Sequence, residues 1–76
     1  MPDLTRALAE TLNTRVFRRA ALLRRAASLR HRADKHDDRA RKLDHAGDTK
    51  AARDHRAVAE DQRNQAADDV QAHDEI

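Results

Sequence analysis

The segment LLRRAASLRHRADKHDDRARKLDHAGDT, residues 22–49, decides the fold of this chain. Along it, small or apolar residues and one histidine recur at alternating steps of four and three, the spacing of a coiled-coil seam. The seam positions are Leu22, Ala26, Leu29, Ala33, His36, Ala40, Leu43 and Gly47. A second, shorter row lies roughly 100° around the same helix. It comprises Val16, Ala20, Leu23 and Ala27. The spacing therefore predicts a long helix with two faces to bury.

One strong turn signal interrupts this helical pattern, at Ala46-Gly47-Asp48-Thr49. Gly47, the only glycine, can adopt the positive φ angle that is needed just past a helix end. Asp48 or Thr49 can cap the helix that follows. Because the turn is so short, the two flanking helices must run antiparallel.

These signals predict an all-α fold, an antiparallel helical hairpin in a single helical domain of residues 1–76. The long helix covers about residues 3–46, the turn covers residues 46–49, and the second helix covers about residues 49–73. The stretch between the only proline and the only glycine is rich in Ala, Arg and Leu, which are strong helix formers.

The second helix has its own apolar side, interrupted by two polar residues. The apolar members are Ala51, Ala52, Val58, Ala59, Ala66 and Val70, and the polar ones are His55 and Gln62. Pairing the helices outward from the turn places Ala40 near His55, Ala33 near Gln62, and Leu29 near Ala66. Large residues on one helix then face small ones on the other. The carboxylates of Asp61, Asp68 and Asp69 are expected on a solvated face.

The N-terminal third of the chain carries apolar residues that this hairpin leaves uncovered, because the second helix is too short to reach them. They are Leu4, Leu8, Leu12, Val16, Phe17 and Leu23. An uncovered patch of this size is typical of an interaction surface. Two alternatives are open: residues 3–12 fold back as a short third helix, or another chain covers them. In the second case a two-fold dimer forms a four-helix bundle.

The dipeptide Asn13-Thr14 bears on that choice. Asn tolerates the left-handed conformation that ends helices, and Thr can cap a new one. In a continuous helix, Arg15 and Arg19 would share a face with Leu8. A break at residues 13–14 and an uninterrupted helix are therefore both compatible with the sequence.

The composition narrows the class of protein. Cysteine is absent, which excludes disulfides and thiolate metal sites. No signal-peptide pattern and no apolar membrane span is recognisable, so the expected location is cytoplasmic. Arg outnumbers Lys thirteen to three, and the richness in Ala, Arg and Asp suggests a GC-rich bacterial source. Net charge is +5 over residues 1–30 and −4 over residues 47–76, so a basic helix faces an acidic one.

The pattern offers no catalytic machinery. The chain has no Gly-rich phosphate loop, nucleophile elbow or cysteine, and so thin a hairpin has no cavity in which to exclude water. Five histidines are present, but none forms an i, i+4 pair or a Glu-x-x-His unit. His36 and His55 are interpreted as polar residues of the seam. We therefore predict a non-enzymatic protein with no metal and no cofactor.

Arginine is concentrated in the long helix. Arg18, Arg25 and Arg32 recur every seven residues and therefore share one face, which could contact phosphates. No aromatic residue is placed to stack on bases, and the acidic second helix would repel nucleic acid. The favoured function is a helical interaction or oligomerisation module that binds a second copy of itself, as a homodimer, or another protein. The alternative is a small nucleic-acid-associated protein, and a membrane role is disfavoured because Arg residues intrude into the apolar face.

Overall fold

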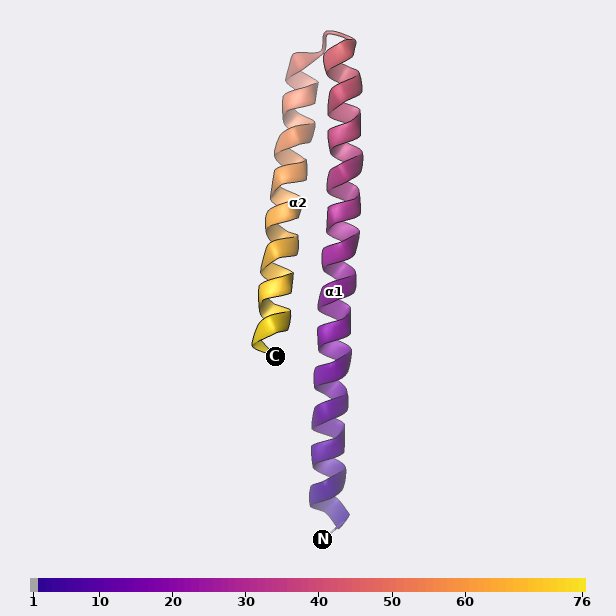
Figure 1. The fold of residues 1–76 in the computed structure, drawn as a ribbon, viewed down its shortest axis with the longest axis vertical. Helices are drawn as coiled ribbons and strands as arrows, with labels where there is room; N and C mark the ends of the chain where they lie inside the picture. Colours follow the sequence, from indigo (N-terminus) through magenta and orange to yellow (C-terminus); the bar gives the residue numbers. More distant parts are fainter. Residues whose placement is uncertain (1) are drawn as a thin grey trace.

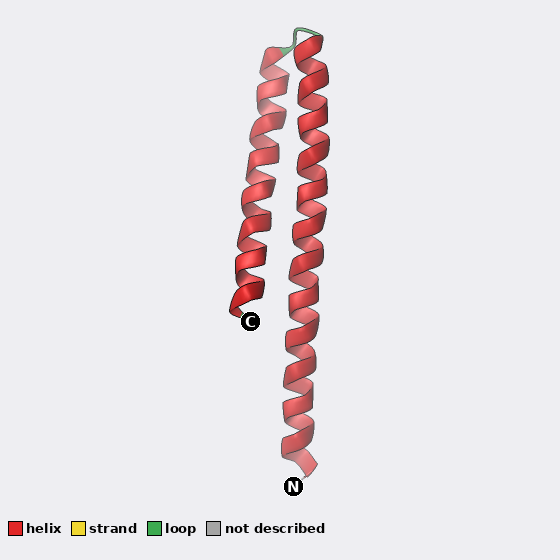
Figure 2. Cartoon of the chain, viewed as in Figure 1, coloured by secondary structure: helices red, strands yellow, loops and turns green. Residues whose placement is uncertain are grey.

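The structure is a two-helix antiparallel hairpin. This computed structural model describes residues 2–76, with side chains from Leu4 onward. Helix α1 (Pro2–His45) and helix α2 (Thr49–Glu75) lie side by side, joined by one tight turn (Figures 1 and 2). The molecule measures 70 × 15 × 12 Å. At about 1.5 Å per residue, α1 alone accounts for the full length of this rod.

The turn has the geometry that its sequence predicts. Gly47 adopts a φ of 85°, which is accessible to glycine at little cost. The Asp48 amide donates to the Leu43 carbonyl at 2.9 Å, and the Gly47 amide donates to the Asp44 carbonyl at 3.0 Å. These two bonds form a Schellman motif that ends α1. The Asp48 carboxylate then accepts from the Ala51 amide at 3.2 Å and caps α2.

The predicted seam lies between the helices. Every seam position from Leu22 to Leu43 is buried or half-buried. Six of the seven buried apolar residues are alanines, and Leu29 is the seventh. The alanines are Ala26, Ala33, Ala40, Ala52, Ala59 and Ala66. Alanine buries little side-chain area, so this core is thin and much of the stability must come from helix propensity.

Two residues of α2 lie on the opposite side from the prediction. Val58 is exposed, although the sequence placed it on the apolar side, and Asp69 is buried, although the sequence placed it in solvent. The buried face of α2 follows alternating three- and four-residue steps, as in α1. Those steps pass through Ala66 and Asp69. Val58 is offset by one residue, about 100° around the helix, so it cannot share that face.

Helix α1 is continuous through Asn13 and Thr14. The Thr11 and Thr14 hydroxyls each donate at 2.9 Å to carbonyls four residues earlier, those of Ala7 and Glu10. Thr14 is therefore satisfied inside the helix rather than serving as a cap. The alternative with a break at residues 13–14 is wrong, and residues 3–12 do not fold back as a third helix.

The position of the core predicts that Leu29 and Leu23 contribute differently to stability. Leu29 belongs to the core cluster with Ala26 and Ala66, against which Val70 packs, whereas Leu23 is 45% exposed. We expect Leu29→Ala to lower the free energy of unfolding by about 2 kcal/mol, because it removes buried methyl groups and leaves a void. The matched change Leu23→Ala should cost less than about 1 kcal/mol. Urea unfolding followed by circular dichroism at low protein concentration measures both, and equal losses would contradict the assigned core.

Candidate interaction surface

Helix α1 extends well beyond the end of α2. It has 44 residues against 27 in α2, a difference of about 25 Å at the helical rise. Residues 4–19 are exposed without exception, and Ala20 is the first residue that α2 half-covers. We call residues 2–19 the N-terminal extension. It projects as a single helix away from the hairpin (Figure 1).

The extension carries most of the exposed apolar surface. Leu4, Leu8, Leu12 and Val16 are each 59–64% exposed. We call these four the leucine row. Because they recur every fourth residue, they form a line that slants slowly around the helix, by about 40° per step. All four are thus brought to one side, as the sequence predicts.

The two remaining predicted surface residues are placed differently. Phe17 is the most exposed large apolar residue, at 72%, but it lies about 100° around the helix from Val16. Leu23 comes seven residues after Val16, so it lies on nearly the same side. The structure therefore joins Leu23 to the upper end of the leucine row and separates Phe17 from it.

The extension is helical without tertiary support. Among its described side chains, the ion pair is Arg6–Glu10, with 3.6 Å between Arg6 Nε and Glu10 Oε1. This order, base before acid, is the weaker one for an i, i+4 pair. Helices in water depend mostly on packing of an apolar face. A partner that covers the leucine row would therefore stabilise the helix as well as bury the row.

The predicted phosphate-binding face is exposed, but its middle residue, Arg25, forms an ion pair with α2. Arg18, Arg25 and Arg32 are all exposed on α1. Arg25 Nε lies 3.3 Å from Asp69 Oδ2 on α2, an ion pair. The Asp69 side chain is only 12% exposed, and Oδ2 accepts no aligned hydrogen bond. The carboxylate is held by charge alone, and it places negative potential within the arginine face.

Asp69 could have been found from the sequence. Extending the seam of α2 by three- and four-residue steps from Ala52 reaches position 69 directly. The sequence interpretation followed apolar residues instead, which led to Val70. Gln62, correctly placed in the seam, also leaves its Oε1 atom buried without a partner.

His36 and His55 meet across the seam, as its two polar members. Their Nδ1 atoms are 2.8 Å apart, and their ring centroids are 5.0 Å apart. A hydrogen bond at this distance requires one Nδ1 to donate and the other to accept. Among the described residues, no group of three or more His, Cys, Asp or Glu could hold a metal ion. The pair therefore forms a hydrogen-bonded layer of the seam.

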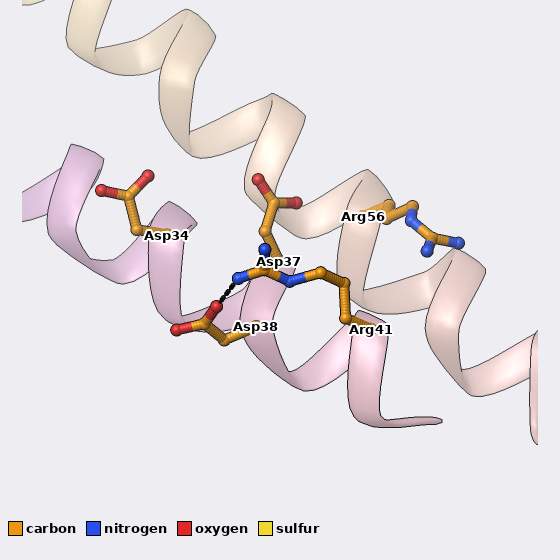
Figure 3. Close-up of a pocket in the computed structure, with 5 residues that line it drawn as sticks. All are labelled: Asp34, Asp37, Asp38, Arg41 and Arg56. Carbon is orange, nitrogen blue, oxygen red and sulfur yellow. Dashed lines mark hydrogen bonds and ion pairs between the residues drawn. The ribbon is translucent and has the colours of Figure 1, made fainter. Parts of the chain in front are cut away.

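A shallow hollow of about 400 Å³ lies beside the seam near the turn. Figure 3 shows its lining, in which Asp34, Asp37, Asp38 and Arg41 come from α1 and Arg56 from α2. Asp38 pairs with Arg41. The remaining acids of the lining are also paired, and none is free to act as a general acid or base.

Ion pairs also cross between the helices in this region. Arg63 Nη2 lies 2.6 Å from Asp37 Oδ2 and 2.9 Å from Asp34 Oδ1. These hydrogen bonds, that to Asp37 first, raise the pKa of the Arg63 guanidinium above its ordinary value. Arg56 pairs with Asp44. Here the bases lie on α2 and the acids on α1, the reverse of the overall charge division between the two halves.

Comparison with known proteins identified no relative: no family model, no curated protein and no solved structure matches the chain.

Because Asp69 is buried, replacing it and replacing its partner Arg25 should have opposite effects on the free energy of unfolding. Asp69→Leu should raise the free energy of unfolding by about 1 kcal/mol, because a leucine replaces a desolvated charge near a helix C-terminus. Arg25→Gln should lower it by about 1 kcal/mol, because the buried carboxylate loses its partner. Thermal and urea unfolding measure both. Asp68→Leu, at the exposed neighbour, is the matched control. A loss of stability in Asp69→Leu would contradict the argument.

Proposed function

We propose that this chain is a non-catalytic helical interaction module. In this reading, residues 20–76 form a stable stem, and the N-terminal extension is the surface that recruits a partner. The observation that carries the proposal is the leucine row, four large apolar side chains on one side of a helix that no other described side chain covers. Full burial of each would contribute about 1.5–3 kcal/mol. An exposed patch of this kind marks a contact with another macromolecule.

The partner is a second copy of the chain or another protein. Of the seven exposed large apolar residues among those described, five lie in the extension, and the stem carries only Leu23 and Val58. A four-helix bundle along the whole hairpin would therefore find little apolar surface to bury. Association through the extension would bury more of the exposed apolar surface than a bundle along the hairpin. Within the stem, we expect the seam to pack as a short antiparallel coiled coil.

Catalysis and cofactor binding form no part of this proposal. The hollow near the turn is shallow, and the acids that line it are satisfied by arginines. Among the described residues, neither helix combines the length and apolarity needed to cross a bilayer.

Removing residues 1–14 tests the proposal. We expect the truncated chain to keep its stem, because the seam from Leu22 to Leu43 and its partners on α2 remain. We also expect it to lose association, because Leu4, Leu8 and Leu12 are gone. Circular dichroism reports the stem. Light scattering and capture of proteins by the immobilised chain report association. Association unchanged by the truncation would overturn the proposal.

The alternative, contact with nucleic acid, rests on the exposed Arg18 and Arg32. Replacing Arg18, Arg25 and Arg32 together by Gln is its matched variant, since Gln keeps helix propensity while removing charge. Under the favoured function, this variant associates normally. If the chain instead binds DNA or RNA, the variant loses that binding, and the affinity of the unchanged chain falls steeply with salt.

A further inference from the structure

We infer that the partner of the leucine row is the leucine row of a second copy, with the two extensions antiparallel and crossing between Leu8 and Leu12. This inference rests on the proposed function and names its partner. Leu4, Leu8, Leu12 and Val16 are evenly spaced and similarly exposed. Reversing the row therefore reproduces its spacing. Leu8 falls opposite Leu12 of the second copy, and Leu4 falls opposite Val16. A surface that is its own complement is the requirement for a two-fold contact.

The spacing of the row sets the crossing. Rows of residues four apart are the ridges that interdigitate when two helices cross at about 50°. The crossing point lies midway along the row, about ten residues or 15 Å from Ala20. That distance exceeds the radius of a helix, so the second copy passes clear of the end of α2. The extension is long enough to be crossed, and the stem does not obstruct it (Figure 1).

Charge selects the antiparallel direction. Arg15, next to the last member of the leucine row, and Arg18 and Arg19 beyond it are all exposed. A parallel pair would stack these arginines on those of the second copy. In the antiparallel pair the two clusters lie at opposite ends of the contact, about 20 Å apart, which is beyond the screening length of physiological salt. The antiparallel direction thus separates the two arginine clusters from each other, and it brings Arg6 level with Thr14, next to Arg15, of the second copy.

The small contact makes the association weak. Four apolar side chains from each copy bury less than the roughly 1,200 Å² typical of a tight, specific interface. We expect a reversible dimer with a dissociation constant of about 10–100 μM, seen as a concentration-dependent mass in light scattering. Leu8→Gln should raise this constant by about 100-fold, because the substitution occurs twice in a two-fold contact. Phe17→Gln, off the row, is the matched control and should leave the constant within about threefold.

Cysteine cross-linking tests the register, since the chain has no cysteine of its own. Two variants of the full chain are used, Leu8→Cys labelled with ¹⁵N and Leu12→Cys unlabelled. Cysteine is a small apolar residue and keeps the contact apolar. Under mild oxidation, the mixture should form mixed-label disulfides in preference to those of either variant alone, because the contact places position 8 against position 12. Glu10→Cys, at the same level on the opposite face, should not cross-link.

Each outcome decides the inference. Preferential mixed-label disulfides support it. Same-variant disulfides that equal the mixed ones would overturn the antiparallel register. A mass that stays monomeric up to about 1 mM would overturn the second copy as partner. In either of these cases the proposed function is decided separately, by whether removal of residues 1–14 abolishes the association or the capture that the full chain shows.

Discussion

The close approach of α1 and α2 along a seam of alanines is the constraint on which the rest of the structure depends. Alanines alternate with larger residues on both helices, so the two axes can come near each other with little apolar volume between them. The gain from burial is correspondingly small. A chain folded this way needs strong helix formers throughout, a well-formed turn, and polar contacts that flank the seam. Its composition and its Gly47 turn supply the first two.

The polar contacts are arranged so that they select one alignment of the helices. His36 and His55 form a hydrogen bond across the seam, and Arg63 bridges two carboxylates on α1. Exposed ion pairs add little to stability. Polar residues inside a seam typically fix register and orientation at some cost in stability. The buried Asp69 fits this role least well, since a single exposed arginine is its partner.

The unequal lengths of the helices produce the exposed apolar surface of the extension. Because α2 ends level with the beginning of the α1 seam, only the alanine-rich part of α1 packs against α2 in the stem. The leucine-rich part is left in solvent. The arginines that interrupt the extension separate these two parts, and they also limit how the exposed part can pair. One long helix thus serves as half of a stem and as a projecting arm.

The sequence by itself determined the helical class, the position of the turn and the α1 side of the seam, because these depend on local propensity and on a regular three- and four-residue spacing. It also determined that the second helix cannot reach residues 4–17, since that depends on length alone, whereas Leu23 lies level with α2 and is exposed because it is off the seam. Tertiary structure decided what depends on a partner helix. The continuation of α1 through Asn13 and Thr14 was balanced in the sequence and does not depend on a partner helix: in the structure, helix propagation outweighs their local preferences for a break. The burial of Asp69 instead of Val58 was decided by the geometric period of the seam, which outweighs the polarity of a single residue.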